Sequence, residues 1–204
     1  MFPVELLAVF VGGLSGALAA VRKQFDLFGV LVLAWAAGLG GGLLRDVLIG
    51  ATPPVGISDW RLVVGALAAG VVAFFFHPRL QRIRRFIAVL DAGALALFSL
   101  VGTLKGLEWE VTGVAAVFVG VLTAIGGGVL RDVLTGEVPA VLHQRQLYAV
   151  PTLVGAIAVV LLWDIGALDA VTSAVVVVGV FGLRLLAMRY KLSAPGPWRG
   201  GLSG

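Results

Sequence analysis

Long apolar runs dominate this 204-residue chain and are separated by short polar segments. Because an α-helix needs about 20 mostly apolar residues to span a membrane, these runs predict seven spanning helices. Their expected bounds are residues 3–21, 27–49, 62–76, 86–104, 111–134, 147–163 and 167–187. The runs are too long for the strands of a membrane β-barrel, and they lack the alternation typical of such strands. The pattern therefore predicts an all-α integral membrane protein.

Composition agrees with this fold class and excludes several kinds of site. The chain is 60% hydrophobic and 13% charged, whereas a soluble domain is about half apolar and about a quarter charged. It has no cysteine and two histidines, so disulfides and cysteine-ligated metals are impossible, and we expect no resident metal or cofactor. We also find no nucleophile with an adjacent base and no phosphate-binding loop, which argues against an enzyme.

Lysine and arginine fall mainly on one side of the predicted membrane. With seven spans, and with Arg45 and Arg131 left out because they lie near or within the membrane, the side of the C-terminus receives eleven basic residues and the other side two. This bias predicts a cytoplasmic C-terminus and an outer N-terminus, in the inner (cell) membrane of a bacterium or archaeon, and it explains the net charge without a nucleic-acid partner. The basic cluster Arg79 to Arg85 is most plainly a topology anchor, with binding of anionic lipid headgroups as the alternative.

Acidic residues collect instead on the outer side of the predicted membrane. They attract cations there by focusing the electric field, or they simply mirror the exclusion of basic residues from that side. Both interpretations remain open.

The sequence contains a repeat with an offset of 86 residues, which pairs Arg45 with Arg131. The same offset pairs Gly40, Gly41 and Gly42 with Gly126, Gly127 and Gly128, Asp46 with Asp132, Pro53 with Pro139, Gly16 with Gly102, and Glu5 with Asp91. Each unit holds three spans, and an odd number inverts the second unit in the membrane. Inverted repeats are common in transport proteins, whose sites lie near the midplane in discontinuous helices.

This repeat predicts the organisation of the whole chain. We expect a first three-helix repeat at residues 1–85 and a second, inverted repeat at 86–166. A seventh helix follows at 167–190, and a disordered cytoplasmic tail at 191–204 completes the chain.

Three consecutive glycines lie in the second predicted helix, at Gly40–Gly42, and in the fifth, at Gly126–Gly128. Each glycine costs about 1 kcal/mol of helix propensity relative to alanine, so both helices are expected to kink there. A kinked glycine segment offers carbonyl oxygens to a hard cation and is tolerated where protein or a water-filled cavity covers it. Close helix packing is the alternative, because small residues let backbones approach, and the two interpretations are compatible.

A charged pair follows each triplet, about one turn before the helix ends: Arg45–Asp46 and Arg131–Asp132. Charged residues at this depth are costly and usually face a cavity or a partner. Neighbours on a helix point about 100° apart, so we expect the arginine and aspartate of each pair not to face each other. We expect each of these side chains to meet a partner on another helix instead, in a network beside a path. An interfacial arginine that snorkels to lipid phosphate is the alternative.

Two further charged residues flank the same regions. Asp91 lies near the start of the fourth predicted helix, where it either joins the path or faces the aqueous interface. Lys105 ends that helix on the outer side, and there snorkelling is favoured over a role as guard of an entrance.

The motifs GGGLLRDV and GGGVLRDV, in a seven-span chain of this length, resemble those of the prokaryotic trimeric intracellular cation (TRIC) channels. Some catalogues label the duplicated domain a glycine transporter. The resemblance covers nearly the whole chain and implies a homotrimer in which each subunit has its own pore, permeable to K⁺ and Na⁺. It places the glycine triplets at kinks of that pore, and it places Arg45, Asp46, Arg131 and Asp132 beside it.

Two functions are compatible with these features. The leading hypothesis is a passive monovalent cation channel, based on the paired glycine triplets, the acidic outer side and the resemblance. The alternative is a secondary carrier of glycine or another small amino acid, because inverted repeats also support alternating access. A carrier usually needs polar groups at the midplane, and those here are few, mainly Ser15, Thr103 and Thr123. The sequence therefore favours the channel and leaves the preference between K⁺ and Na⁺ open.

Overall fold

The computed structural model describes residues 2–77, 83–142 and 147–192, and these residues form helices joined by short connections. The elements are α1 (Phe2–Arg22), α2 (Leu27–Leu48), α3 (Val55–Ser58), α4 (Trp60–Phe76), α5 (Ile83–Glu108), α6 (Gly113–Leu134), the 3₁₀ turn η2 (Ala140–Leu142), α7 (Ala149–Asp164) and α8 (Ala170–Tyr190). Hydropathy did not predict α3 or η2, because each is a short turn between apolar runs.

Five of the described helices are long and apolar enough to cross a membrane, namely α1, α2, α5, α6 and α8. The helices α4 and α7 are also apolar but shorter, at 17 and 16 residues. The all-α membrane fold is thus confirmed, while a count of seven spans stays a prediction. Most of the basic cluster and the expected tail from residue 193 onward lie outside the described residues.

Local sequence determines where the two glycine-bearing helices begin and end. The side chain of Asp26 caps α2 by accepting a hydrogen bond from the backbone N of Gly29 at 2.8 Å, and Thr112 caps α6 in the same way. Such caps satisfy backbone donors that have no partner within the helix. Gly50 and Gly136 follow these helices with φ of 74° and 69°, a left-handed conformation that glycine adopts without steric cost.

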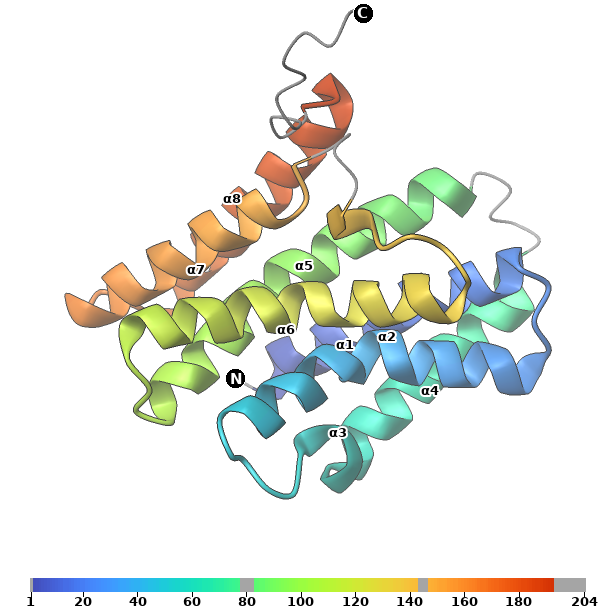
Figure 1. Cartoon of the computed structure of the whole chain (residues 1–204), viewed down its shortest axis with the longest axis horizontal. Helices are drawn as coiled ribbons and strands as arrows, with labels where there is room; N and C mark the ends of the chain where they lie inside the picture. Colours follow the sequence, from blue (N-terminus) through green and yellow to red (C-terminus); the bar gives the residue numbers. More distant parts are fainter. Residues whose placement is uncertain (1, 78–82, 143–146, 193–204) are drawn as a thin grey trace, which may run out of the picture.

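The two repeats pack into one core, and α2 and α6 contact each other in it. Figure 1 shows α2 and α6 side by side and running in opposite directions, so their C-terminal ends lie at opposite ends of the bundle. The helix α1 packs against α2 and α4 within the first repeat and against α5 of the second, so the α1–α5 and α2–α6 contacts join the repeats. The last helix, α8, belongs to neither repeat and packs against α5 and α7.

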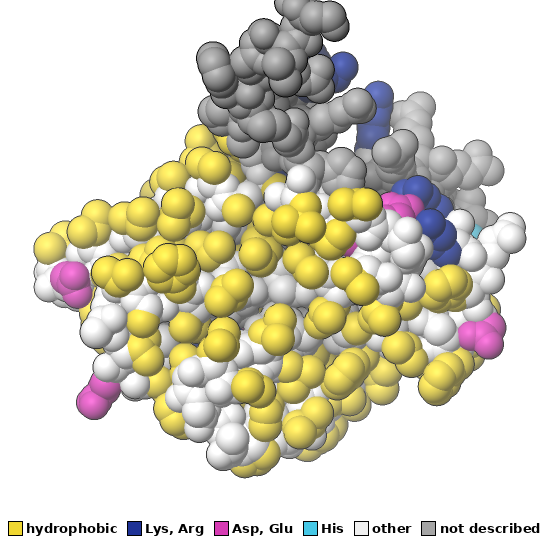
Figure 2. Space-filling model, in the orientation of Figure 1, with side chains coloured by type: hydrophobic (Ala, Val, Ile, Leu, Met, Phe, Trp, Pro, Cys, Tyr) yellow, Lys and Arg dark blue, Asp and Glu magenta, His cyan; other side chains and the backbone are white. Residues whose placement is uncertain are grey.

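The outside of the bundle is apolar. Phe28, Phe118 and Val171 lie on three different helices and are 74%, 64% and 69% exposed. Figure 2 shows hydrophobic side chains over most of the visible face, with charged side chains toward its margins. A soluble monomer rarely exposes so large an apolar surface, so this surface is suited to lipid or to other subunits.

Candidate functional site

The glycine triplets bring the backbones of α2 and α6 into direct contact. A Cβ atom added to Gly41 would overlap the carbonyl oxygen of Thr123, and one added to Gly127 would overlap the carbonyl oxygen of Ala37. A Cβ on Gly126 would lie 3.1 Å from the Cα of Gly41. The triplets therefore act as the close-packing surface that small residues provide between membrane helices.

Both helices remain α-helical through their triplets. The unwound segment with bare carbonyl oxygens that the sequence suggested is therefore not present in this structure. A kink at the glycines stays a prediction, and the packing interpretation has direct structural support.

The first charged site surrounds Arg45, near the end of α2. Its Nε donates to Asp46 Oδ1 at 2.8 Å, and its Nη2 donates to Glu5 Oε1 at 3.1 Å. The ammonium of Lys105 lies 3.1 Å from the same Asp46 oxygen. The other Asp46 oxygen accepts a hydrogen bond from the backbone N of Val55 at 2.7 Å. The site thus joins α1, α2, α3 and α5.

The second charged site surrounds Arg131, near the end of α6. Its Nε and Nη2 lie 2.9 and 2.8 Å from Asp132 Oδ1, and its Nη1 donates to Asp91 Oδ1 at 2.6 Å and to Ser15 Oγ at 2.7 Å. The other Asp132 oxygen accepts a hydrogen bond from the backbone N of Ala140 at 2.8 Å. In both sites the arginine also binds a carboxylate from the first helix of its own repeat, Glu5 in the first site and Asp91 in the second. Each of these carboxylates lies 40 residues before its arginine.

These contacts correct two expectations from the sequence. Arg45 does pair with Asp46, and Arg131 with Asp132, because a long guanidinium side chain folds back along its helix and overcomes the 100° offset. Lys105 does not snorkel, since its ammonium points to the fully buried Asp46. Neither arginine reaches lipid, with exposed fractions of 0% for Arg45 and 6% for Arg131.

The two sites are not identical, and the repeat offset shows where they differ. The counterpart of Lys105 in the second site is Ala19, which lines a cavity instead of carrying a charge. The counterpart of Ser15 in the first site is Val101, which has no hydroxyl. Arg45 Nη1 accordingly has no hydrogen-bond partner among the residues that the structure describes.

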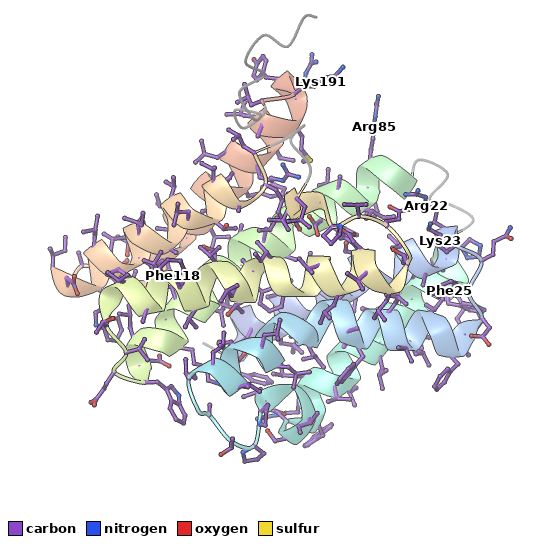
Figure 3. The ribbon with its side chains drawn as sticks, viewed as in Figure 1. Arg22, Lys23, Phe25, Arg85, Phe118 and Lys191 are labelled. Carbon is purple, nitrogen blue, oxygen red and sulfur yellow. The ribbon has the colours of Figure 1, made fainter. Side chains whose placement is uncertain are left out.

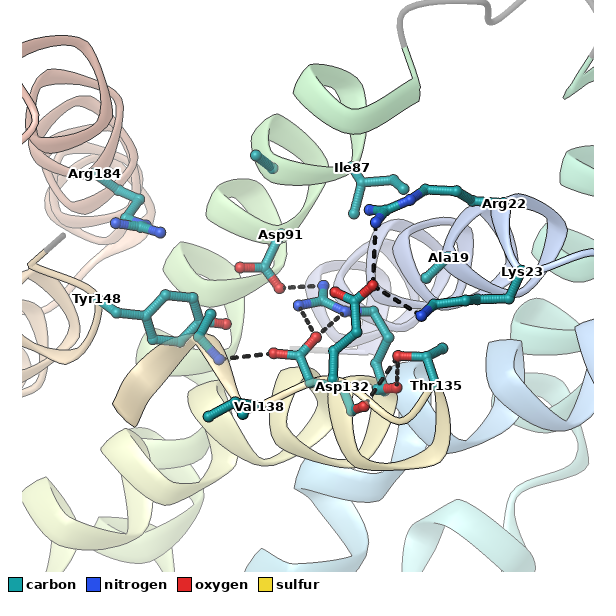
Figure 4. Close-up of a pocket in the computed structure, with 14 residues that line it drawn as sticks. Ala19, Arg22, Lys23, Ile87, Asp91, Asp132, Thr135, Val138, Tyr148 and Arg184 are labelled. Carbon is teal, nitrogen blue, oxygen red and sulfur yellow. Dashed lines mark hydrogen bonds and ion pairs between the residues drawn. The ribbon is translucent and has the colours of Figure 1, made fainter. Parts of the chain in front are cut away.

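A cavity of about 570 Å³ opens beside the second charged site (Figure 4). Asp91, Arg131 and Asp132 form its inner wall. At its edge, Glu137 Oε1 lies 3.1 Å from Arg22 Nη2 and from Lys23 Nζ at the end of α1. Four basic and three acidic residues line it in total: Arg22, Lys23, Arg131 and Arg184, with Asp91, Asp132 and Glu137.

Tyr148 and Arg184 complete the wall of this cavity, and the sequence did not identify either as a site residue. The guanidinium of Arg184 lies 4.7 Å from the centre of the Tyr148 ring, and its Nη1 donates to the carbonyl oxygen of Leu147 at 3.0 Å. Both side chains are 4% exposed. The sequence does contain one signal for Arg184, because it is a charged residue within the last apolar run. The count of basic residues assigned it instead to the cytoplasmic surface.

The described ranges, residues 2–77, 83–142 and 147–192, offer no cluster suited to a metal ion. No group of three or more histidine, aspartate and glutamate side chains there is arranged to hold one. The charged sites are instead ion-pair networks, whose acidic oxygens are already contacted by arginine, lysine or backbone N–H groups.

Comparison with known proteins relates nearly the whole chain to one group of membrane proteins. Residues 3–78 and 88–164 each match the family model described as "Glycine transporter". A UPF0126 membrane protein of Deinococcus radiodurans is 43% identical over 160 residues, which cover 78% of this chain and 74% of that protein. The UPF0126 inner membrane protein YadS of Escherichia coli is 30% identical, with 94% of this chain and 93% of that protein covered.

The fold also matches a solved structure. The crystal structure of the TRIC trimeric intracellular cation channel orthologue from Rhodobacter sphaeroides superposes with a TM-score of 0.89 at 34% sequence identity. The match covers 94% of this chain and 98% of that chain.

Proposed function

We propose that this chain, which belongs to the trimeric intracellular cation (TRIC) channel family, is a passive channel for monovalent cations in a bacterial inner membrane. The path runs within one subunit. It begins at the cavity beside the second charged site, passes the contact between α2 and α6 at the glycine triplets, and ends at the first charged site. The channel assembles as a homotrimer with one path per subunit, which the trimeric solved relative supports.

The observation that carries this proposal is the pair of buried charged sites at opposite ends of two antiparallel helices. At the inner wall of the cavity one guanidinium, Arg131, faces the two carboxylates of Asp91 and Asp132. These three side chains alone carry one excess negative charge, and the buried guanidinium of Arg184 in the cavity wall offsets it, so a cation is attracted locally by the two carboxylates and not by a net charge of the cavity. Because the two carboxylates are buried, salt screens them much less than it screens exposed charges.

The first charged site is balanced in charge in this structure. Arg45 and Lys105 face Glu5 and Asp46 at 2.8 to 3.1 Å. The ammonium of Lys105 takes the position beside Asp46 that a permeating cation needs, so the path is closed at this end. Displacement of this ammonium opens the path, which gives Lys105 the role of guarding the entrance.

The edge of the cavity carries two cationic side chains, which by themselves repel cations. Arg22 and Lys23 are both paired with Glu137, and the three side chains are 35% to 42% exposed. Water and salt screen charges at this exposure. The exposed charges at the edge therefore oppose the attraction of the two buried carboxylates less than buried charges would.

The second charged site faces the cytoplasm and the first faces outward. Figure 3 shows Arg22, Lys23, Arg85 and Lys191 toward one side of the molecule, where α1 and α8 end and α5 begins. Basic residues concentrate on the cytoplasmic side of membrane proteins. This orientation is tested by labelling single cysteines on either side of the membrane, at Lys191 and at Glu110.

Single-channel recording in a planar bilayer tests the proposed activity. Under a KCl gradient, the purified protein is expected to give unitary currents that reverse near the K⁺ equilibrium potential. Lys105→Met is expected to increase the current, because it removes the ammonium from Asp46. Arg61→Gln removes a like charge from an exposed position that pairs with Asp59, and it serves as the matched control. Silence of folded trimers across a wide voltage range would contradict the channel.

The alternative function is carriage of glycine or another small amino acid. The family description "Glycine transporter" and a cavity lined by both acidic and basic side chains favour it. Saturable uptake of labelled glycine into liposomes, without unitary conductance, would replace the channel by this carrier.

A further inference from the structure

Tyr148 fills the space left by the third glycine of the second triplet. It lies directly before α7 and reaches across the inner end of the cavity toward α6 (Figure 4). A Cβ atom added to Gly128 would lie 2.6 Å from the Tyr148 hydroxyl and 3.3 Å from Asp91 Oδ1. The hydroxyl thus lies at the glycine backbone, beside a carboxylate of the second charged site.

The other repeat has no such side chain. The counterpart of Gly128 is Gly42, where an added Cβ would meet only Arg45 Nη2 and Cζ, at 3.7 and 4.0 Å, within the described residues, which are ordinary contact distances. The counterpart of Tyr148 is Leu62, a buried aliphatic residue of the core. The repeat fold therefore forms without an aromatic ring at this position, and the tyrosine is specific to the cavity.

Arg184 holds this ring from a helix that lies outside both repeats. Its guanidinium stacks on the Tyr148 ring at 4.7 Å and also binds the carbonyl oxygen of Leu147, the preceding residue. One side chain of α8 thereby restrains both the ring and the backbone at its base. A buried cation over an aromatic face is a strong restraint, because it is desolvated.

Arg184 lies on the packed face of α8, together with Val180 and Ala187, which are each 2% exposed. A Cβ atom added to Gly179 or to Gly182 would meet nothing within 4 Å among the described residues. These glycines lie on another face of the helix, so the packed face holds Arg184, and a movement of α8 against α5 and α7 changes the position of Arg184 over the ring.

We propose that Tyr148 is the gate of the path at the second charged site, and that Arg184 is the positioning residue that keeps it closed. This inference rests on the proposed channel function. Rotation of the ring toward the cavity, which has about 570 Å³ of free space, withdraws the hydroxyl from Gly128. The cavity, which Asp91 and Arg131 already line, then connects to the glycine contact, and α8 acquires a role that the two repeats do not supply.

Open probability in symmetric KCl is the first test of this gate. Tyr148→Ala and Arg184→Gln are each expected to raise it about tenfold, equivalent to about 1.4 kcal/mol of lost closed-state stabilisation. Arg184→Lys restores part of the wild-type value, because it keeps a cation near the ring. Tyr190→Ala and Arg189→Gln are matched changes elsewhere on α8 and leave open probability unchanged. A wild-type open probability in Tyr148→Ala overturns the gate.

A second measurement does not depend on current. The chain has no cysteine, so Ser15→Cys introduces a single thiol behind Arg131, at a position that is 2% exposed. In this background Tyr148→Ala is expected to raise the rate at which a positively charged methanethiosulfonate reagent modifies the introduced thiol from the cavity side. An unchanged rate contradicts the gate. A raised rate in a protein that carries no current supports the gate and contradicts the channel, so the two proposals fail separately.

Discussion

Replacing single glycines of one triplet by alanine separates contacts that the sequence presents as equivalent. Gly41→Ala places a methyl group on the carbonyl oxygen of Thr123, whereas Gly42→Ala places it 3.7 Å from its nearest neighbour, Arg45 Nη2. A backbone carbonyl cannot rotate away, so α2 and α6 must separate in the first variant. The second variant needs no such movement.

The structure sets the expected magnitudes for this pair. Overpacking a well-packed core costs about 1–3 kcal/mol, while alanine in place of glycine gains about 1 kcal/mol of helix propensity. We therefore expect Gly41→Ala to lose as much as about 2 kcal/mol of stability and Gly42→Ala to gain as much as about 1 kcal/mol. The difference between these adjacent, chemically identical substitutions is the overpacking cost, about 1–3 kcal/mol.

Thermal unfolding in detergent micelles, followed by far-ultraviolet circular dichroism, measures this difference. Gly127→Ala should behave like Gly41→Ala, because its methyl group meets the carbonyl oxygen of Ala37. If Gly41→Ala is as stable as Gly42→Ala, the close approach of the two helices is refuted. If Gly41→Ala and Gly127→Ala both fold yet conduct like the wild type, the glycines are packing elements and play no part in conduction.

Three further substitutions test other contacts. Ser15→Ala removes a hydrogen bond to a charged group and should cost about 1.5–3 kcal/mol in chemical denaturation; no change would mean that Arg131 is satisfied without it. Glu137→Gln should cost less than about 1 kcal/mol, and the loss should disappear in high KCl; a loss that persists in high salt would show that these pairs are not screened. Gly136→Ala should lower stability by about 1–2 kcal/mol, because an L-residue is strained at a φ of 69°, and Gly136→Asn should lower it less; equal stability of Gly136→Ala and the wild type would contradict the left-handed turn.

The apolar runs along the chain predicted the helices, because a helix that meets lipid must be apolar over most of its length. The bounds of α2 and α6 agree with the expected spans to within two residues, since each apolar run is followed by a glycine that marks its end. The offset of 86 residues also predicted which segments correspond, and the structure places Arg45 with Glu5 and Arg131 with Asp91 in matching pairs.

Tertiary structure decided the partners of those residues. The hydrogen bond between Arg131 and Ser15 joins positions 116 residues apart, and no periodicity within one helix records such a contact. The pairing of Arg45 with Asp46 escapes prediction for a different reason, because the angle between neighbouring positions on a helix does not fix where a long side chain ends. The path of such a flexible side chain depends on which space its neighbours leave free.

The sequence by itself determined the membrane helices, the duplication and the positions of the glycines and charges, because each is recorded in local composition or in a repeated motif. Only the tertiary structure distinguished the members of each triplet. It placed a backbone carbonyl against Gly41, the Arg45 guanidinium at ordinary contact distance from Gly42 and the Tyr148 hydroxyl against Gly128. These differences arise from the neighbours that α6, α7 and α8 bring to each position, and such neighbours are set by packing across the whole bundle.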